Sequence, residues 1–191
     1  MRQRLDVARP PVYDAVRNNL TWANHAARTM VTGGLIAWWA PEYIVDPACG
    51  DASILEAAYR LRPFKFAVLA DISEPQVDSL KPSFPASWEV GDVNDIIANT
   101  ETTWDCVVLT EILEHLEDPD ATLRLARKHG SALVASSPIG DPEQGGNHEH
   151  LWAWDEIGYG EMLSAAGWTE VLRSTVTMPG VNGNAQIWIC R

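Results

Sequence analysis

Long apolar stretches are missing from this sequence. No apolar run approaches the ~20 residues that a membrane-spanning helix needs, and residues 1–30 carry charges throughout, without the apolar centre of a secretion signal. These absences argue against a membrane partner and against export. We therefore expect a soluble protein with a cytoplasmic location.

Cysteine and positive charge are also scarce. Cys49, Cys106 and Cys190 are odd in number and lack CxxC spacing, so we expect all three to be reduced and buried. The chain has 14 Lys and Arg against 26 Asp and Glu, and its net charge of −12 would repel a phosphate backbone. We expect no nucleic-acid partner.

The length of 191 residues suits a single α/β domain and is too short for two. Apolar residues recur at helical spacing over residues 12–30 and resume over residues 35–40, with Gly33 and Gly34 between them. This pattern predicts two helices ahead of the sheet, and an irregular tail or short arm over residues 1–10.

Residues 43–55 hold a local pattern of strand, loop and helix. Apolar residues lead into Asp46, a turn of small residues follows, and an amphipathic helix begins at about Ala52. Such a unit often holds a nucleotide-like ligand, because the start of the helix presents free N–H groups. Gly50 is the position expected to need left-handed backbone. The alternative is a turn with a purely structural role.

The run Asp46-Pro47-Ala48-Cys49-Gly50-Asp51-Ala52 resembles motif I of the class I S-adenosylmethionine (SAM) dependent methyltransferases, usually Asp-x-Gly-x-Gly-x-Gly. Ala48 and Ala52 replace two of the three glycines. The resemblance implies that SAM, and its product S-adenosyl-L-homocysteine, are bound by Asp46, Pro47, Ala48, Cys49 and Gly50. It also implies an α/β, Rossmann-like sheet of seven mostly parallel strands with helices on both faces, an antiparallel C-terminal hairpin and an N-terminal helical cap.

Within this frame, residues 43–191 are the expected SAM-binding core and residues 1–42 the cap of the single domain. The cap has two possible roles: it covers one face of the sheet, or it closes over the ligand as a lid.

Two further acids follow predicted strands. Asp71 ends a strand at residues 65–71, close to the ~20-residue spacing at which a dinucleotide fold places an acid on ribose hydroxyls. The alternative is a cap on the next helix. The resemblance implies that Asp92 accepts the adenine amino group, that Val93 packs on the ring, and that Ile72 also contacts SAM. Asp92 could equally be the N-cap of a helix over residues 94–98.

After the central predicted strand at residues 105–109, the run from Glu111 to Pro119 resembles the Glu-x-x-Glu-His-x-x-x-Pro segment of quinone-biosynthesis and other small-molecule methyltransferases. The resemblance implies that Thr110 and Glu111 contact SAM. Enzymes that methylate adenine in DNA carry Asn/Asp-Pro-Pro-aromatic here to hold a flipped base, and this chain lacks that motif.

Methyl transfer from a sulfonium is an in-line displacement, so the protein mainly aligns the reactants and excludes water. Histidine is the natural base where the acceptor must lose a proton. The candidates are His115, His148 and His150, and a structural role is the alternative for His115. A metal held by Asp141, Glu149 and the last two histidines lacks any strong spacing signature, so we expect no metal.

The acceptor site is expected between the N-terminal helices and the long loop after residue 137, with Trp22, His25 and Trp152 lining it. The prediction is a SAM-dependent methyltransferase acting on an O, N or C atom of a small molecule, such as a metabolite or sugar, as a monomer or homodimer. The alternatives are a SAM-binding regulatory or inactive domain and, less favoured, a nucleic-acid methyltransferase. A nicotinamide enzyme would need Gly-x-Gly-x-x-Gly, which is absent at this turn.

Overall fold

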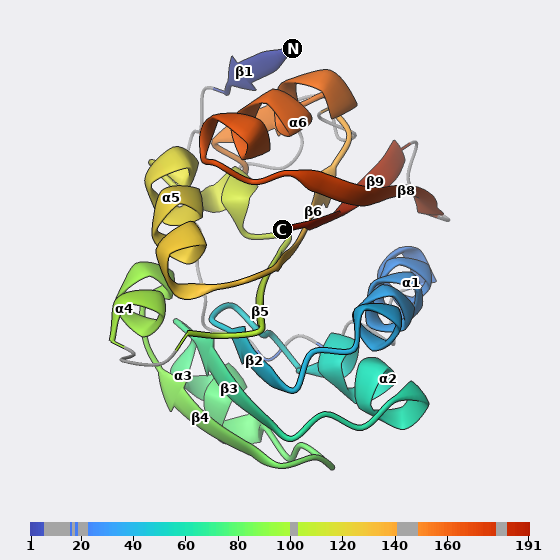
Figure 1. Cartoon of the computed structure of the whole chain (residues 1–191), viewed down its shortest axis with the longest axis vertical. Helices are drawn as coiled ribbons and strands as arrows, with labels where there is room; N and C mark the ends of the chain where they lie inside the picture. Colours follow the sequence, from blue (N-terminus) through green and yellow to red (C-terminus); the bar gives the residue numbers. More distant parts are fainter. Residues whose placement is uncertain (6–15, 17, 19–22, 100–102, 141–148, 179–182) are drawn as a thin grey trace.

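A seven-stranded sheet forms the centre of the computed structural model, which describes residues 1–5, 16, 18, 23–99, 103–140, 149–178 and 183–191. Helices lie on both faces of this sheet (Figure 1). The elements are β1 Arg2–Arg4, α1 Ala23–Trp39, β2 Tyr43–Asp46, α2 Ser53–Leu61, β3 Phe66–Asp71, α3 Glu74–Ser79, β4 Ala86–Val90, α4 Val93–Ala98, β5 Cys106–Thr110, the short 3-10 helix η2 Leu113–His115, α5 Pro119–His129, β6 Leu133–Pro138, β7 Trp152–Trp154, α6 Glu156–Ala165, β8 Glu170–Met178 and β9 Gly183–Cys190.

The strand order of the sheet is β4-β3-β2-β5-β6-β9-β8. β2 to β6 are parallel, whereas β9 runs antiparallel to both β6 and β8. This is the Rossmann-like sheet predicted from the sequence. The chain order reverses between β2 and β5, so the loops that follow these two strands meet at one edge, which is where open α/β sheets bind ligands.

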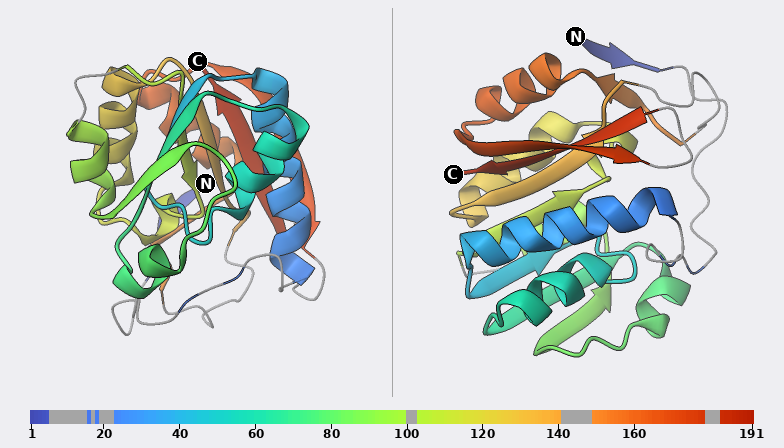
Figure 2. Two further views of the ribbon diagram at one scale, coloured as in Figure 1. Left: turned by 90° about the horizontal axis from the view of Figure 1, so that it is seen from below. Right: turned by 90° about the vertical axis from the view of Figure 1, so that its right-hand side faces the viewer.

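Side chains of the central strands point alternately to the two faces of the sheet and pack into two separate hydrophobic cores. Val107 packs with α4, α5 and α6 on one face, and Val108 packs with α1 and α2 on the other. Figure 2 shows α1 and α2 together on one side of the sheet and α4 and α5 on the opposite side. Every residue of β5 and β6 is buried, as expected for central parallel strands covered on both faces.

The N-terminal region differs from the prediction, because α1 continues through Gly33 and Gly34 without a break. Gly33 lies where α1 crosses α2: a Cβ there would meet Ala57 Cβ at 2.7 Å and the Ile54 carbonyl oxygen at 2.8 Å. The glycine therefore permits close packing of the two helices and does not end the first. Of the predicted helix over residues 12–30, the part before residue 23 falls almost entirely outside the described residues.

A second, two-stranded sheet was not predicted. β1 pairs antiparallel with β7, so residues 2–4 of the expected irregular arm are a strand. The guanidinium of Arg2 lies 4.3 Å from the ring centroid of Trp152 and forms a 2.5 Å ion pair with Asp120. These contacts tie the chain's beginning to the segment before α6.

All three cysteines are buried and unpaired, as predicted. Among the described residues, no helix combines the length and the apolar character that crossing a membrane requires.

Candidate active site

The loop after β2 is fastened to β3 at the carboxyl edge of the sheet. The Cys49 N–H donates to the carbonyl of Ala70 at 2.8 Å, and the Gly50 N–H donates to Asp71 Oδ2 at 3.1 Å. Asp71 Oδ1 accepts from the Ser73 N–H at 2.9 Å, and Ser73 is the N-cap of α3. Asp71 therefore braces two loops, while each carboxylate oxygen keeps a second lone pair for a ligand.

Asp46 lies at the base of this loop. It is 1% exposed, and its Oδ1 has no hydrogen-bond partner in the described part of the chain. Burial raises the pKa of this carboxyl to about 8, a backbone hydrogen bond from Ala48 opposes the rise, and the charges of Asp71 and Asp51 add to it. The group is thus poised to be neutral near pH 7 and to ionise when a cation arrives.

Two residues of the loop adopt left-handed backbone, where one was predicted. Gly50 has φ 53°, and Ala52, the N-cap of α2, has φ 58°. The prediction that only Gly50 needs this conformation is wrong, because the Ala52 N–H turns back to the Cys49 carbonyl at 2.9 Å before the helix starts. A residue other than glycine pays roughly 1–2 kcal/mol for this conformation. The loop therefore adopts the backbone conformation typical of glycine with alanine at position 52.

The predicted adenine-binding residues occupy different environments. Asp92 is the N-cap of α4 and accepts from the Asn94 N–H at 2.8 Å, which is the alternative considered from the sequence. Val93 is 5% exposed and packs in the core beneath α4, whereas Ile72, just after β3, is 54% exposed. Ile72 is therefore the apolar surface that this edge offers to a ring.

A buried ion pair joins α1 to the loop after β5. Arg28, 3% exposed, pairs with the carboxylate of Glu111, whose backbone is left-handed at φ 54°. Ser136 of β6 donates its hydroxyl to Glu111 Oε1 at 2.9 Å, and His25 Nδ1 lies 2.9 Å from Arg28 Nη2. The predicted residues Glu111 and His25 are thus linked through Arg28. Thr110, the last residue of β5, directly precedes Glu111.

Glu114, His115 and His150 come together next to this pair. The two imidazole rings meet edge to face with centroids 4.9 Å apart. His115 Nδ1 lies 3.0 Å from the carbonyl oxygen of Glu149, which only accepts, so Nδ1 carries the proton. Burial, and then the charge of His150, lower the pKa of His115 to about 4. His115 is therefore neutral near pH 7, and its Nε2 carries a lone pair.

Glu114 and Tyr159 are buried polar groups behind the two histidines. Burial raises the pKa of Glu114 well above its usual range, and the charge of Glu111 adds to the effect. Burial, and then Glu114, raise the pKa of the Tyr159 hydroxyl. Within the described residues, neither Glu114 oxygen nor the Tyr159 hydroxyl has a hydrogen-bond partner.

The remaining predicted catalytic and acceptor-site residues are Trp152, Trp22 and His148. Trp152 lies in β7, where its ring stacks on Trp154 at 6.3 Å and its Nε1 donates to the Leu116 carbonyl at 2.8 Å. Trp22 and the candidate base His148 lie outside the described residues, as does Asp141.

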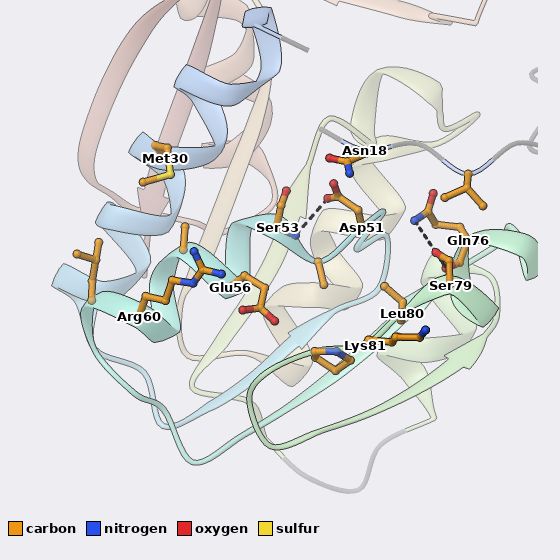
Figure 3. A pocket seen from close by; sticks show the side chains of 15 residues that line it. Asn18, Met30, Asp51, Ser53, Glu56, Arg60, Gln76, Ser79, Leu80 and Lys81 are labelled. Carbon is orange, nitrogen blue, oxygen red and sulfur yellow. Dashed lines mark hydrogen bonds between the residues drawn. The ribbon is translucent and has the colours of Figure 1, made fainter. Parts of the chain in front are cut away.

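A pocket of about 480 Å³ adjoins the β2 loop from the side of α2 and α3. Asp51, Ser53 and Gln76 are among its polar lining residues, and Figure 3 shows the hydrogen bonds from Ser53 to Asp51 and from Gln76 to Ser79. Asp46, Asp71 and Asp92 are not among the described residues that line it. The pocket therefore borders the β2 loop at Asp51 and Ala52.

Sequence reasoning missed Arg28, Ser136 and Tyr159. Arg28 left one signal, an arginine three residues after His25 on a helix that is otherwise mostly apolar. Ser136 and Tyr159 left none, because their roles depend on how β6 and α6 pack.

The family model for a methyltransferase domain matches residues 45–130. The sequence matches no curated protein. Among solved structures, the N-methyltransferase NodS of Bradyrhizobium japonicum, in complex with S-adenosyl-L-homocysteine, has a TM-score of 0.71 at 19% identity, covering 89% of this chain and 88% of that one.

Two further structures share the fold. The 1,6-didemethyltoxoflavin-N1-methyltransferase of Burkholderia thailandensis, with its substrate and S-adenosylhomocysteine bound, has a TM-score of 0.70 at 14% identity, covering 86% of this chain and 78% of its own. The magnesium protoporphyrin IX methyltransferase of Synechocystis has a TM-score of 0.67 at 15% identity, covering 93% and 89%.

Proposed function

We propose that this chain, which is a class I SAM-dependent methyltransferase, transfers the methyl group to an O, N or C atom of a small-molecule acceptor. The observation that carries the proposal is the meeting of two sets of residues at one sheet edge: the Asp71-braced loop after β2, and the Glu111 to His115 segment after β5. One set fits a cofactor and the other supplies polar side chains for an acceptor.

SAM would bind along the loops after β2, β3 and β4. Asp71 would hold the ribose hydroxyls with the lone pairs that Gly50 and Ser73 leave unused. The buried carboxyl of Asp46 would respond to the positive charge of SAM. The other proposed contacts are Pro47, Ala48, Cys49, Gly50, Ile72, Asp92, Val93, Thr110 and Glu111.

The acceptor would lie beside Glu111, with the start of α1 as one wall. The Arg28–Glu111 pair anchors α1 to the loop after β5, and His25 contacts Arg28 from the preceding turn of the helix. This supports residues 1–42 as a cap that both covers the sheet and borders the acceptor, with Trp22 and His25 on the acceptor side.

Among the histidines, His150 is the strongest candidate base that the structure describes. His115 is a weak base because its pKa lies near 4. His150 is 8% exposed and lies directly against His115. His148, two residues earlier in the sequence, stays a second candidate.

The related proteins with known structures support a small acceptor, since one is named for a toxoflavin precursor and another for magnesium protoporphyrin IX. The charge of this chain supports the same class over nucleic acid. A SAM-binding regulatory or inactive domain is the second candidate, because it would keep the cofactor loop without needing a base for the acceptor.

The test is to incubate the chain with methyl-labelled SAM and a metabolite extract, and to search for labelled products by mass spectrometry. A labelled small molecule is expected, and Asp71→Ala should yield less of it at a limiting SAM concentration. Label in bulk nucleic acid, or SAM binding without any labelled product, would contradict the proposal.

A further inference from the structure

Glu114, His115 and His150 form a cluster that the proposed cofactor site does not use. One side-chain atom from each residue, a carboxylate oxygen and two imidazole nitrogens, lies within 4.8 Å of the other two. Glu114 and His115 come from η2, after β5, and His150 precedes β7. Three ligand-type atoms from two distant segments thus converge on one point.

The orientation of His115 suits a metal ligand. Its Nδ1–H donates to the main-chain carbonyl of Glu149 at 3.0 Å, which fixes the ring and leaves Nε2 with a lone pair. Metal-binding histidines typically have their second nitrogen bonded in this way, to a carbonyl or a carboxylate. The ring of His150 meets that of His115 with centroids 4.9 Å apart.

Glu114 supplies an independent observation. The residue is 1% exposed, and neither carboxylate oxygen has a hydrogen-bond partner in the described part of the protein. Buried carboxyl groups in proteins are normally paired, hydrogen-bonded or bound to a metal, because a buried polar group without a partner is costly. A cation between Glu114 and the histidines would be such a partner.

We propose that Glu114, His115 and His150 bind one divalent transition-metal ion. Two imidazoles and one carboxylate suit Zn²⁺, Mn²⁺, Co²⁺ or Fe²⁺, whereas Ca²⁺ and Mg²⁺ prefer oxygen ligands alone. Around an ion with bonds of about 2.1 Å, ligand atoms lie roughly 3.0–3.4 Å apart. The three ligand atoms, which lie within 4.8 Å of one another, would therefore approach by at most about 1–2 Å on binding, which rotation about their side-chain bonds allows.

Metal binding here goes beyond methyl transfer and does not depend on it. Three protein ligands leave open positions on the ion, where an acceptor oxygen or nitrogen could bind and be polarised. An imidazole nitrogen that binds a metal cannot also take the acceptor's proton. With the ion bound, His148 would therefore be the candidate base, and His150 would have the role proposed above only in the metal-free protein. No metal was predicted from the sequence, because η2 and His150 are distant in the chain and only the fold brings them together.

The test uses chelator-treated, tag-free protein, titrated calorimetrically with Mn²⁺, Co²⁺ and Zn²⁺ without SAM or acceptor. The intact chain should bind at least one of these ions at one site and unfold at a higher temperature with it. Bound Co²⁺ should also give the visible absorption of a nitrogen-ligated ion. Because even indirect contacts to a metal ligand change affinity about 10–100-fold, Glu114→Gln and His150→Ala should each weaken binding by more than about 100-fold.

His129→Ala is the matched control, since His129 ends α5 away from the cluster, and it should leave binding unchanged. Glu114→Gln keeps the shape of the side chain and removes a buried carboxyl, so this variant should be folded and at least as heat-stable as the metal-free parent. No binding of any of the three ions by the folded chain would overturn the proposal. Equal binding by the parent and Glu114→Gln would do the same. SAM affinity measured on these samples tells failure of the metal site from failure of the methyltransferase assignment.

Discussion

Two parts of the same sheet edge are built in different ways. The loop after β2 is contiguous in sequence, and backbone N–H groups and one acid, Asp71, hold it. The side proposed for the acceptor, called the acceptor side below, is assembled from α1, the segment after β5 and the residue pair before β7, through buried charged and polar side chains. The first part is a local structure that tolerates alanine in place of the motif glycines. The second part forms only when the whole domain has folded.

The difference shows in how each part tolerates substitution. The loop carries alanine in a left-handed position and still keeps its path. The acceptor side depends on specific side chains, because removing one member leaves another buried and uncompensated. Five variants test this contrast.

The largest effect is expected for His150→Ala. Loss of this side chain should lower turnover by roughly 10²–10⁴-fold, whether it acts as a base or as a metal ligand. SAM affinity should not change, because the residue belongs to the acceptor side. Product formation and calorimetry of SAM measure the two quantities, with His129→Ala as control. A loss of SAM affinity as large as the loss of turnover would show that His150 also serves cofactor binding, and that the two parts of the edge do not act separately.

The second-largest effect is expected for Arg28→Met. It keeps the aliphatic length, and Glu111 then retains Ser136 as its hydrogen-bond partner among the described residues. The side chains of Arg28 and Glu111 are 4% and 18% exposed. Breaking a buried pair costs about 3–5 kcal/mol in free energy of unfolding. Urea unfolding measures it, the exposed Arg124→Ala serves as control, and Arg28→Met with Glu111→Gln should recover part of the loss. An unchanged unfolding midpoint would show that the pair does not hold α1.

How far the sequence predicted the molecule follows the same division. The separate strands and α2, at residues 53–61, follow from apolar runs and turn residues that lie next to each other, whereas the seven-stranded sheet was implied by the family resemblance. The break at Gly33 was wrong because that glycine serves the contact with α2, a long-range feature.

The acceptor side was predicted only in part. His115 and His150 were named, but the pairing of Arg28 with Glu111 and the place of Glu114 beside both histidines depend on which segments the sheet brings together. β1 was missed for the same reason: a polar Arg-Gln-Arg strand carries no apolar alternation, and its partner Trp152 lies near the other end of the chain.

Asp71→Ala tests the loop side directly. It removes the acceptor for the Gly50 N–H together with the proposed ribose contact. Charge-assisted hydrogen bonds of this kind contribute roughly 1.5–3 kcal/mol, so SAM affinity should fall about ten- to a hundredfold. Calorimetry measures it, with the exposed Asp78→Ala of α3 as control. Unchanged affinity in a folded variant would remove Asp71 from the cofactor site.

Asp46 gives the loop side a pH dependence. Its pKa is 3.8 when unfolded and about 8 when folded, so between these values the native state holds a proton that the unfolded state has lost. Stability is therefore lost as pH rises through this range. From pH 6 to pH 8 the parent should lose roughly 2 kcal/mol more than Asp46→Asn, at about 1.4 kcal/mol per pH unit. If urea unfolding shows that the parent and Asp46→Asn lose the same free energy of unfolding between pH 6 and pH 8, the carboxyl of Asp46 is not buried and protonated.

The smallest effect compares two buried alanines of the same loop–helix unit. Ala52 is 2% exposed at φ 58°, and Ala58 is 0% exposed inside α2. Replacing either with glycine removes a buried methyl worth about 0.8 kcal/mol and loosens the unfolded chain by roughly 0.5–1 kcal/mol. Only at position 52 does glycine also relieve the left-handed strain of roughly 1–2 kcal/mol. Ala52→Gly should therefore leave the free energy of unfolding almost unchanged, while Ala58→Gly lowers it by about 1–2 kcal/mol. Equal losses in urea unfolding would mean that the loop carries no strain at Ala52, and that its tolerance of alanine has another origin.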